Sequence, residues 1–324
     1  MNTILFNLCC FCLTNIAITL IGYLIFKNRL VWPAWSILIV SISLVSIIFW
    51  HSDPVIKMLT IIATTFNGMK VVAATADSKR KLIGLSFMQW CKFAAGWAGM
   101  RAQPFEITNN KPLPGAWPMV SFGISRLAAG LGLIFLVRLI FKLPINADVK
   151  FAITSILLLI GLSLVLHFGL LSISAGMWRL SGINTYFLFK QPAKATSLTE
   201  FWSKRWNLAF SEMTSLTLFR PLKNEIGVSP ALLIAFAFSG LLHELALSAP
   251  VNTGYGSPML YFLLQGLLVM LEKSAVLQRS KLLKQQVAAR VWTFFWLAVP
   301  APLLFHTQFI KHVVWPLCSI TPVF

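Results

Sequence analysis

Charged side chains are scarce in this sequence, and acidic ones most of all. Only 11% of the 324 residues are charged, and just 9 are Asp or Glu. Soluble domains carry about 25% charged residues, so an ordinary water-exposed surface is excluded. The 57% share of hydrophobic residues indicates an integral membrane protein whose outer surface faces lipid.

Signatures of several familiar sites are also missing. The five cysteines show neither zinc-ligand spacing nor a disulfide framework. Leu247 stands where an H-E-x-x-H zinc site would place its second histidine after His243. The stretch Ala237–Gly240 does not form a G-x-S-x-G nucleophile elbow. We therefore expect no metal and no cofactor, and the sequence does not suggest a covalent acyl-enzyme.

Long apolar runs dominate what is present. They are about 20 residues long, as a membrane-crossing helix requires, and do not alternate with the period of a strand. They lie at residues 3–26, 30–50, 55–76, 118–140, 151–176, 228–249, 257–271, 291–306 and 307–324. Residues 82–99 fit a tilted span or a re-entrant segment equally well, and residues 272–290 read as a basic amphipathic connector. We predict an all-α, polytopic membrane protein with about eight or nine transmembrane helices in a single domain, residues 1–324.

The scarce charges are strongly biased in sign. Lys and Arg number 27, which gives a formal net charge of +18. The positive-inside bias explains most of this and places the loops Lys27–Arg29 and Ser78–Lys81 in the cytosol. No nucleic-acid motif accompanies the charge. Anionic lipid head groups, or a phosphate-rich substrate such as a coenzyme A thioester, are the expected partners.

One polar stretch interrupts the apolar pattern. "TEFWSKRWNLAFSEM", residues 199–213, places five charged or amide side chains among large aromatics, just before another apolar span. It is either a surface helix lying on lipid head groups, anchored by its tryptophans, or the polar half of an active site. Asn207 is the residue that the first interpretation does not need.

His243 and Glu244 lie side by side within an apolar segment. Ionisable groups at membrane depth tend to face a bundle interior or a wet cavity. Ser239 lies four residues before His243, on the same helical face, and could hydrogen-bond it. His243 is either a polar contact between helices or a general base. As a base it would take a proton from a substrate hydroxyl, and an amide such as Asn207 would stabilise the reacting oxygens.

Both motifs resemble the wax synthase-type branch of the membrane-bound O-acyltransferases. Phe201–Asn207, "FWSKRWN", matches F-W-x-R-R-W-[HN], and Ser239–Glu244, "SGLLHE", matches S-G-x-x-H-E. "FLLQGLLVMLE" at 262–272 is similar to the family's next helix. "WAGMRAQPF" at 97–105 resembles, more weakly, another segment that is common in bacterial-looking members. The motif-bearing region is thus about 97–272. Lys204 departs from the frequent Arg, which keeps the charge but loses the planar fork.

The resemblance implies transfer of a fatty acyl group from acyl-CoA to an alcohol. It assigns the catalytic histidine to His243 and its polar partner to Asn207. It implies helices around an internal tunnel, with acyl-CoA as co-substrate entering from the cytosol and a lipophilic hydroxyl acceptor from the membrane. Five further residues are expected to contact substrate: Lys204, Arg205, Trp206, Ser239 and Glu244. The sequence leaves open whether the membrane is a bacterial inner membrane or the endoplasmic reticulum.

Two hypotheses from other classes stay open at this point. A lipid or solute transporter could use His243 and Glu244 as a proton relay. A non-catalytic membrane scaffold would tolerate loss of His243. A transporter has no reason to carry the motif pair, and release of free CoA from acyl-CoA discriminates the enzyme from both alternatives.

Overall fold

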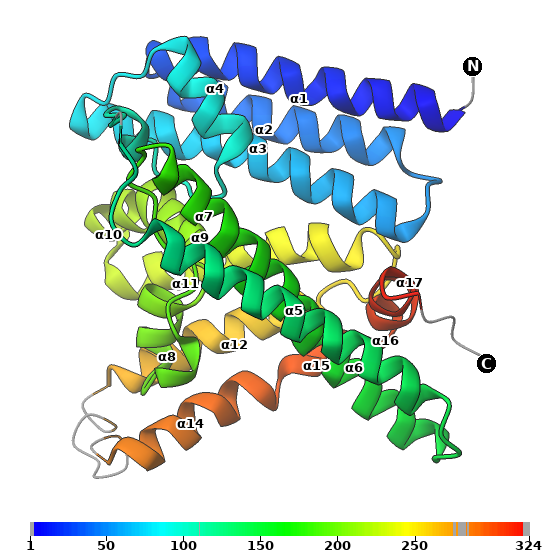
Figure 1. The fold of residues 1–324 in the computed structure, drawn as a ribbon. Coiled ribbons are helices and arrows are strands. Elements are labelled where there is room, and N and C mark those ends of the chain that lie inside the picture. The colour runs from blue at the N-terminus through cyan, green and yellow to red at the C-terminus, as the bar shows by residue number, and fades with distance from the viewer. Residues whose placement is uncertain (1–2, 110, 275–276, 278–282, 284, 320–324) are drawn as a thin grey trace. The chain divides into compact units, whose positions relative to one another are not determined.

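The computed structural model describes residues 3–109, 111–274, 277, 283 and 285–319. All regular elements in this part of the chain are helical, as the apolar runs predict (Figure 1). Seven helices are long and apolar enough to cross a membrane, and α12 (Ser257–Glu272) is a shorter apolar helix. The fold class is confirmed, with seven such helices where the sequence indicates eight or nine. Part of the predicted connector at 272–290 falls outside the described residues, which there are 272–274, 277, 283 and 285–290.

Two of the predicted apolar segments contain only short helices. Residues 82–99 contain α4 (Phe87–Gly96), which has 10 residues and cannot cross a bilayer. Residues 307–317 form three short helical pieces, α16 (Thr307–Phe309), η7 (Ile310–Val314) and α17 (Trp315–Leu317). The choice left open for 82–99 is therefore decided against a tilted span.

The described chain divides into two compact units. The first comprises residues up to Glu106 together with Lys190–His306, and the second comprises Ile107–Phe189 with the residues from Thr307 onward. Every motif singled out from the sequence lies in the first unit. The prediction of one domain, and that of an internal tunnel, stay predictions.

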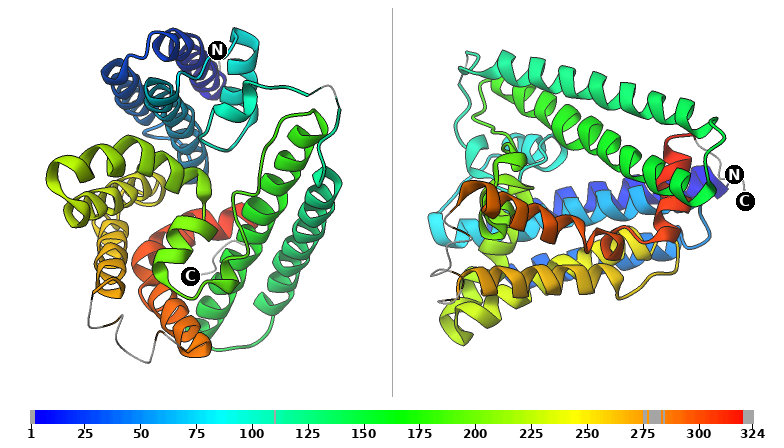
Figure 2. Two further views of the ribbon diagram at one scale, coloured as in Figure 1. Left: turned by 90° about the vertical axis from the view of Figure 1, so that its left-hand side faces the viewer. Right: turned by 90° about the horizontal axis from the view of Figure 1, so that it is seen from below.

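In the first unit, three long helices lie side by side (Figures 1 and 2). They are α1 (Thr3–Lys27), α2 (Val31–Ile48) and α3 (Pro54–Lys81). The α3 helix begins where the Asp53 carboxylate accepts the Val55 N–H at 2.8 Å, and ends with Leu82 in the left-handed conformation. Lys79–Lys81 fill its last turn, where cations complement the helix dipole.

The same unit holds the helices that carry the motifs. These are the short α8 (Leu198–Glu200), η4 (Phe201–Arg205), α9 (Leu208–Thr214), η5 (Ser215–Phe219) and α10 (Arg220–Ile226). The long α11 (Val228–His243), continued by the π-helical turn η6 (Glu244–Ser248), packs on α12. The unit ends with α14 (Gln286–Ala298) and α15 (Ala301–Leu304).

The second unit is built on a helical hairpin. The α5 helix (Ala116–Phe141) runs beside one long helix formed by α6 (Ala147–Ser163), the π-helical η2 (Leu164–Leu170) and α7 (Leu171–Leu180) (Figure 2). Glycine lets the backbones approach, since a Cβ on Gly130 would lie 2.7 Å from the Gly161 carbonyl oxygen. Small residues at such contacts are typical of membrane helix packing.

Candidate active site

His243 is the last residue of α11, and its hydrogen bond fixes its tautomer. Its Nδ1 lies 2.7 Å from the backbone carbonyl oxygen of Ser239. A carbonyl oxygen can only accept, so Nδ1 carries the proton and Nε2 keeps the free lone pair. The predicted contact with Ser239 is present through the backbone, because the Ser239 hydroxyl donates to the Ala235 carbonyl at 2.9 Å. The atom able to accept a proton is therefore Nε2.

Aromatic rings surround this imidazole. The ring centroid of Phe262, on α12, lies 4.3 Å from that of His243. Phe210, on α9, meets His243 edge-on at 6.1 Å. Trp202 packs behind Phe262 at 5.6 Å, and its indole N–H donates to the Gln265 side-chain oxygen at 3.2 Å. These walls are apolar.

Asn207 occupies the turn between η4 and α9. Its backbone is left-handed, with φ +43° and ψ 67°, a region that asparagine tolerates better than most residues. Its Oδ1 accepts the Phe210 N–H at 3.2 Å and so caps α9. This bond places the amide NH₂ on the other side, and that NH₂ makes no hydrogen bond within the described chain.

Phe210 links the two predicted catalytic residues. Its backbone N–H bonds to Asn207, and its ring contacts His243. The first unit thus brings the "FWSKRWN" and "SGLLHE" motifs into one neighbourhood, with a free lone pair on His243 and a free amide donor on Asn207. Both groups are of the kinds that acyl transfer needs.

Arg205 and Lys204 have different environments, although the sequence treats them alike. The Arg205 guanidinium bonds to the Glu200 carboxylate at 2.6 and 2.8 Å, and to the Lys190 and Gln191 carbonyls at 3.2–3.3 Å. Lys204 is exposed and forms no ion pair within the described residues. Arg205 therefore braces the motif, and Lys204 is the cation available to an incoming anion.

The Glu200 carboxylate is held ionised. The backbone N–H of Thr196 lowers its pKa most, the Thr196 hydroxyl and Arg205 add to this, and partial burial opposes it. The Thr196 N–H donates to Glu200 Oε2 at 2.9 Å. The pair Glu200–Arg205 is thus intact at neutral pH.

Trp206 packs into the protein. Its ring stacks on the buried Phe201 at 5.4 Å with 14° between the planes. Its backbone N–H donates to the Phe201 carbonyl at 2.9 Å. Trp206 thus closes the π-helical turn η4, and its predicted contact with substrate stays a prediction.

Glu244 has a structural role that the sequence does not reveal. Its Oε1 accepts the N–H groups of Gly256 and Met259 at 2.9 and 3.0 Å, which caps the N-terminus of α12. The other oxygen, Oε2, is buried without a hydrogen-bond partner in the described structure. The carboxylate and the imidazole of His243 therefore bond to separate backbone partners. Substrate contact by Glu244 and Ser239 stays a prediction.

Other contacts around the site could not be derived from the motifs. Glu212, at the end of the polar stretch, forms an ion pair with Arg101 at 3.1 Å. Gln265 is fully buried and joins Trp202 to the Trp296 carbonyl, to which it donates at 2.7 Å. In the sequence, Glu212 is only a carboxylate within a motif and Gln265 only an amide within an apolar helix. Neither observation predicts which residue the side chain contacts.

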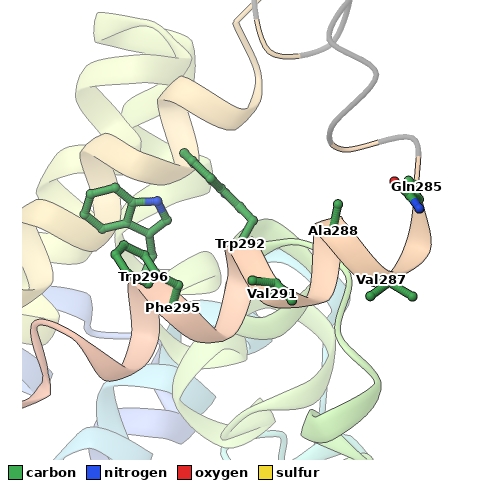
Figure 3. A pocket seen from close by; sticks show the side chains of 7 residues that line it. All are labelled: Gln285, Val287, Ala288, Val291, Trp292, Phe295 and Trp296. Carbon is green, nitrogen blue, oxygen red and sulfur yellow. The ribbon is translucent and has the colours of Figure 1, made fainter.

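The described residues offer no metal site, and an apolar pocket lies along α14. Groups of three or more His, Cys, Asp or Glu do not gather anywhere in the described ranges. A pocket of about 410 Å³ runs along α14 (Figure 3). It is lined by Gln285, Val287, Ala288, Val291, Trp292, Phe295 and Trp296. None of these is a predicted site residue, and Val287 and Val291 are more than 60% exposed, as on a lipid-facing helix.

Comparison with known proteins agrees with the resemblance. The model of the membrane bound O-acyl transferase family matches residues 186–264. A long-chain-alcohol O-fatty-acyltransferase of Simmondsia chinensis is 39% identical over 71 residues, 19% of this chain and 20% of that protein. The probable long-chain-alcohol O-fatty-acyltransferase 9 of Arabidopsis thaliana is 31% identical over 136 residues, 38% of this chain and 40% of that protein.

A third relative extends the match furthest along the chain. The probable long-chain-alcohol O-fatty-acyltransferase 2 of Arabidopsis thaliana is 31% identical over 160 residues, which are 45% of each protein. The chain therefore matches between a fifth and just under half of the length of these relatives. The predicted resemblance to wax synthase-type enzymes is confirmed, and the family model covers both main motifs within residues 186–264.

Proposed function

We propose that this chain, whose residues 186–264 match the membrane bound O-acyl transferase family, is an acyl-CoA:alcohol O-acyltransferase of the membrane. The observation that carries the proposal is the bond from His243 Nδ1 to the Ser239 carbonyl. It leaves Nε2 free to accept a proton. The free amide NH₂ of Asn207 supports it from the other motif.

The proposed reaction needs no covalent enzyme intermediate. His243 Nε2 takes the proton of the acceptor hydroxyl as the alcohol oxygen attacks the thioester carbonyl. The Asn207 amide donates to the oxygen on which negative charge develops. As the intermediate collapses, the carbon–sulfur bond breaks and His243 returns its proton to the CoA thiolate. One thioester and one alcohol give one ester and one free thiol.

The proposed acceptor is a long-chain alcohol. The relatives' names specify this class for those proteins, and Phe210 and Phe262 give His243 aromatic, apolar neighbours. The proposed donor is acyl-CoA, and the exposed ammonium of Lys204 is available to its phosphates. The transporter alternative, with His243 and Glu244 as a proton relay, receives no specific support, because one oxygen of the Glu244 carboxylate caps α12.

The test is His243→Gln in the purified, detergent-solubilised protein, assayed with radiolabelled acyl-CoA and a panel of alcohols. Glutamine keeps a polar side chain but cannot accept and return a proton at neutral pH. Since a general base contributes ~10²–10⁴-fold, we expect turnover to fall by that factor. His51→Gln, in an exposed turn, is the matched control and should leave turnover unchanged. A folded His243→Gln protein with near wild-type turnover would refute the proposed base.

A further inference from the structure

The ion pair between Arg101 and Glu212 joins two segments far apart in the sequence. Arg101 Nε lies 3.1 Å from Glu212 Oε1. The Glu212 side chain is only 14% exposed and that of Arg101 is 41% exposed. Glu212 belongs to α9, the seven-residue helix whose N-cap is Asn207. The α9 helix continues without a break into η5 and α10, so Glu212 lies near the start of a helical run from Leu208 to Ile226. An ion pair at this place acts on the end of the run next to Asn207.

The segment that bears Arg101 is itself firmly anchored. The Lys70 ammonium, on α3, is fully buried and bonds to the carbonyls of Phe93 and Ala94 at 2.8 Å and to that of Trp97. These carbonyls lie at the C-terminal end of α4, where a cation is favoured by the helix dipole. The chain reaches Arg101 within a few residues of this anchor. Arg101 is therefore held in place relative to α3, which is the most buried of the long helices.

The α9 helix is in contact with both catalytic groups of the proposed mechanism. Asn207 precedes its first residue, and Phe210 contacts the His243 ring. The Glu200–Arg205 ion pair holds the chain on the N-terminal side of Asn207. The Arg101–Glu212 ion pair holds the chain on its C-terminal side. Loss of the second brace would loosen the start of this helical run, beside the left-handed turn at Asn207.

We infer that Arg101 is a positioning residue of the acyl-transfer site: through Glu212 it holds α9 so that the Asn207 amide is presented beside His243. The inference rests on the proposed function for its effect on turnover, but its structural part does not. Arg101 acts through Glu212 and touches neither substrate nor the reacting atoms.

The kinetic test uses Arg101→Gln, Glu212→Gln and the double variant. A misplacement of 1 Å costs on the order of 10²-fold, so a loosened α9 should lower kcat by about tenfold. The Michaelis constant for acyl-CoA should change little, because no binding contact is removed. The double variant should be no worse than the more affected single variant, since both changes delete the same interaction. Glu225→Gln, an exposed acidic residue on α10, is the matched control for the loss of one charge.

A second measurement does not depend on activity. The amides of Phe210 and Ser211 bond to the Asn207 carbonyl at 3.0 and 3.1 Å, so their hydrogen exchange reports how well α9 is held. Arg101→Gln should speed exchange in the peptide 207–214, and Glu225→Gln should not. A wild-type protein that makes no ester, together with this exchange pattern, would refute the proposed function and keep the brace.

Other outcomes overturn the inference. Unchanged exchange and turnover in Arg101→Gln, in an active wild-type background, refutes the brace and keeps the function. A raised Michaelis constant for acyl-CoA with unchanged kcat would make Arg101 a donor contact instead. Because either single variant could unfold, Arg101→Lys serves as the mild variant: it keeps the charge, and its turnover should lie between wild type and Arg101→Gln.

Discussion

Asn207 combines two roles that substitutions can separate. Its Oδ1 caps α9 and its amide NH₂ is free. Asn207→Asp keeps the capping oxygen and removes the donor. Asn207→Gly removes both, but glycine accepts φ +43° without a Cβ penalty. Asn207→Ala removes both and adds strain in the left-handed region.

The expected costs follow from these contacts. Loss of an N-cap to alanine costs about 1 kcal/mol, and a Cβ in the left-handed region costs roughly 1–2 kcal/mol. Asn207→Ala should therefore destabilise by about 2–3 kcal/mol. Asn207→Gly should cost only a few tenths of a kcal/mol at the cap, and Asn207→Asp should be near neutral. Turnover should not follow stability. All three variants lose the amide donor, and loss of one oxyanion donor costs ~10²–10³-fold in turnover.

The assay pairs ester formation from radiolabelled acyl-CoA with thermal unfolding in detergent for each variant. Asn207→Asp should fall furthest in turnover, since its carboxylate also repels the developing negative charge. Asn207→Gly isolates the loss of the donor. If turnover instead followed stability, with Asn207→Gly active and Asn207→Ala inactive, Asn207 would be a helix cap alone and the mechanism would lose its oxyanion donor.

Two further predictions address the framework around the site. The pKa of Glu200 is lowered in the folded protein, so its stabilising contribution is present above about pH 4.5, the ordinary pKa of the group, and is lost as the pH falls through the folded value. The stability difference between wild type and Glu200→Gln should therefore be constant from pH 5 to 7 and shrink at lower pH; a difference that grows on acidification contradicts the pairing. In the hairpin, Gly130→Ile should destabilise by about 1–3 kcal/mol through overpacking, whereas Gly132→Ile, whose Cβ would meet nothing within 4 Å, should not. Equal thermal unfolding of the two glycine variants would contradict the hairpin packing.

The sequence predicted the long helices well because membrane spans are a local property. A run of about 20 apolar residues is sufficient to form one, whatever its neighbours. Residues 82–99 are the instructive exception. Ser86 and Gln89 form a capping box that starts α4 late, and Lys70 binds the carbonyls at its end. The first signal is legible in the sequence, but the second is a contact between helices that apolarity does not encode.

The candidate site can be proposed from the sequence, but the contacts that hold it in place cannot. His243 and Asn207 stand out because polar groups in apolar surroundings need a reason. Glu244 stands out for the same reason, yet one of its oxygens caps α12 through a loop that folds back onto it. Capping across a loop depends on backbone geometry, which residue types do not specify. Polarity alone therefore marks candidate residues, but it does not separate proposed catalytic groups from structural ones.

Lys204 and Arg205 show how the structure sharpens a prediction made from charge. As neighbouring cations, both are expected to meet donor phosphates. The Arg205 guanidinium, 22% exposed, already bonds to Glu200 and to two carbonyls, so its removal breaks the brace ahead of Asn207. Lys204 has no such partner among the described residues.

The two cations should therefore separate in kinetics. Lys204→Gln should raise the Michaelis constant for acyl-CoA with little change in kcat, as loss of a uniform binding contact does. Arg205→Gln should lower thermal stability and kcat together, because the left-handed turn at Asn207 loses its support. The Michaelis constant for the alcohol serves as the internal control in both variants. If Lys204→Gln had no effect and Arg205→Gln changed only the Michaelis constant for acyl-CoA, the assignment would be reversed, and the Arg205 guanidinium would be the donor contact.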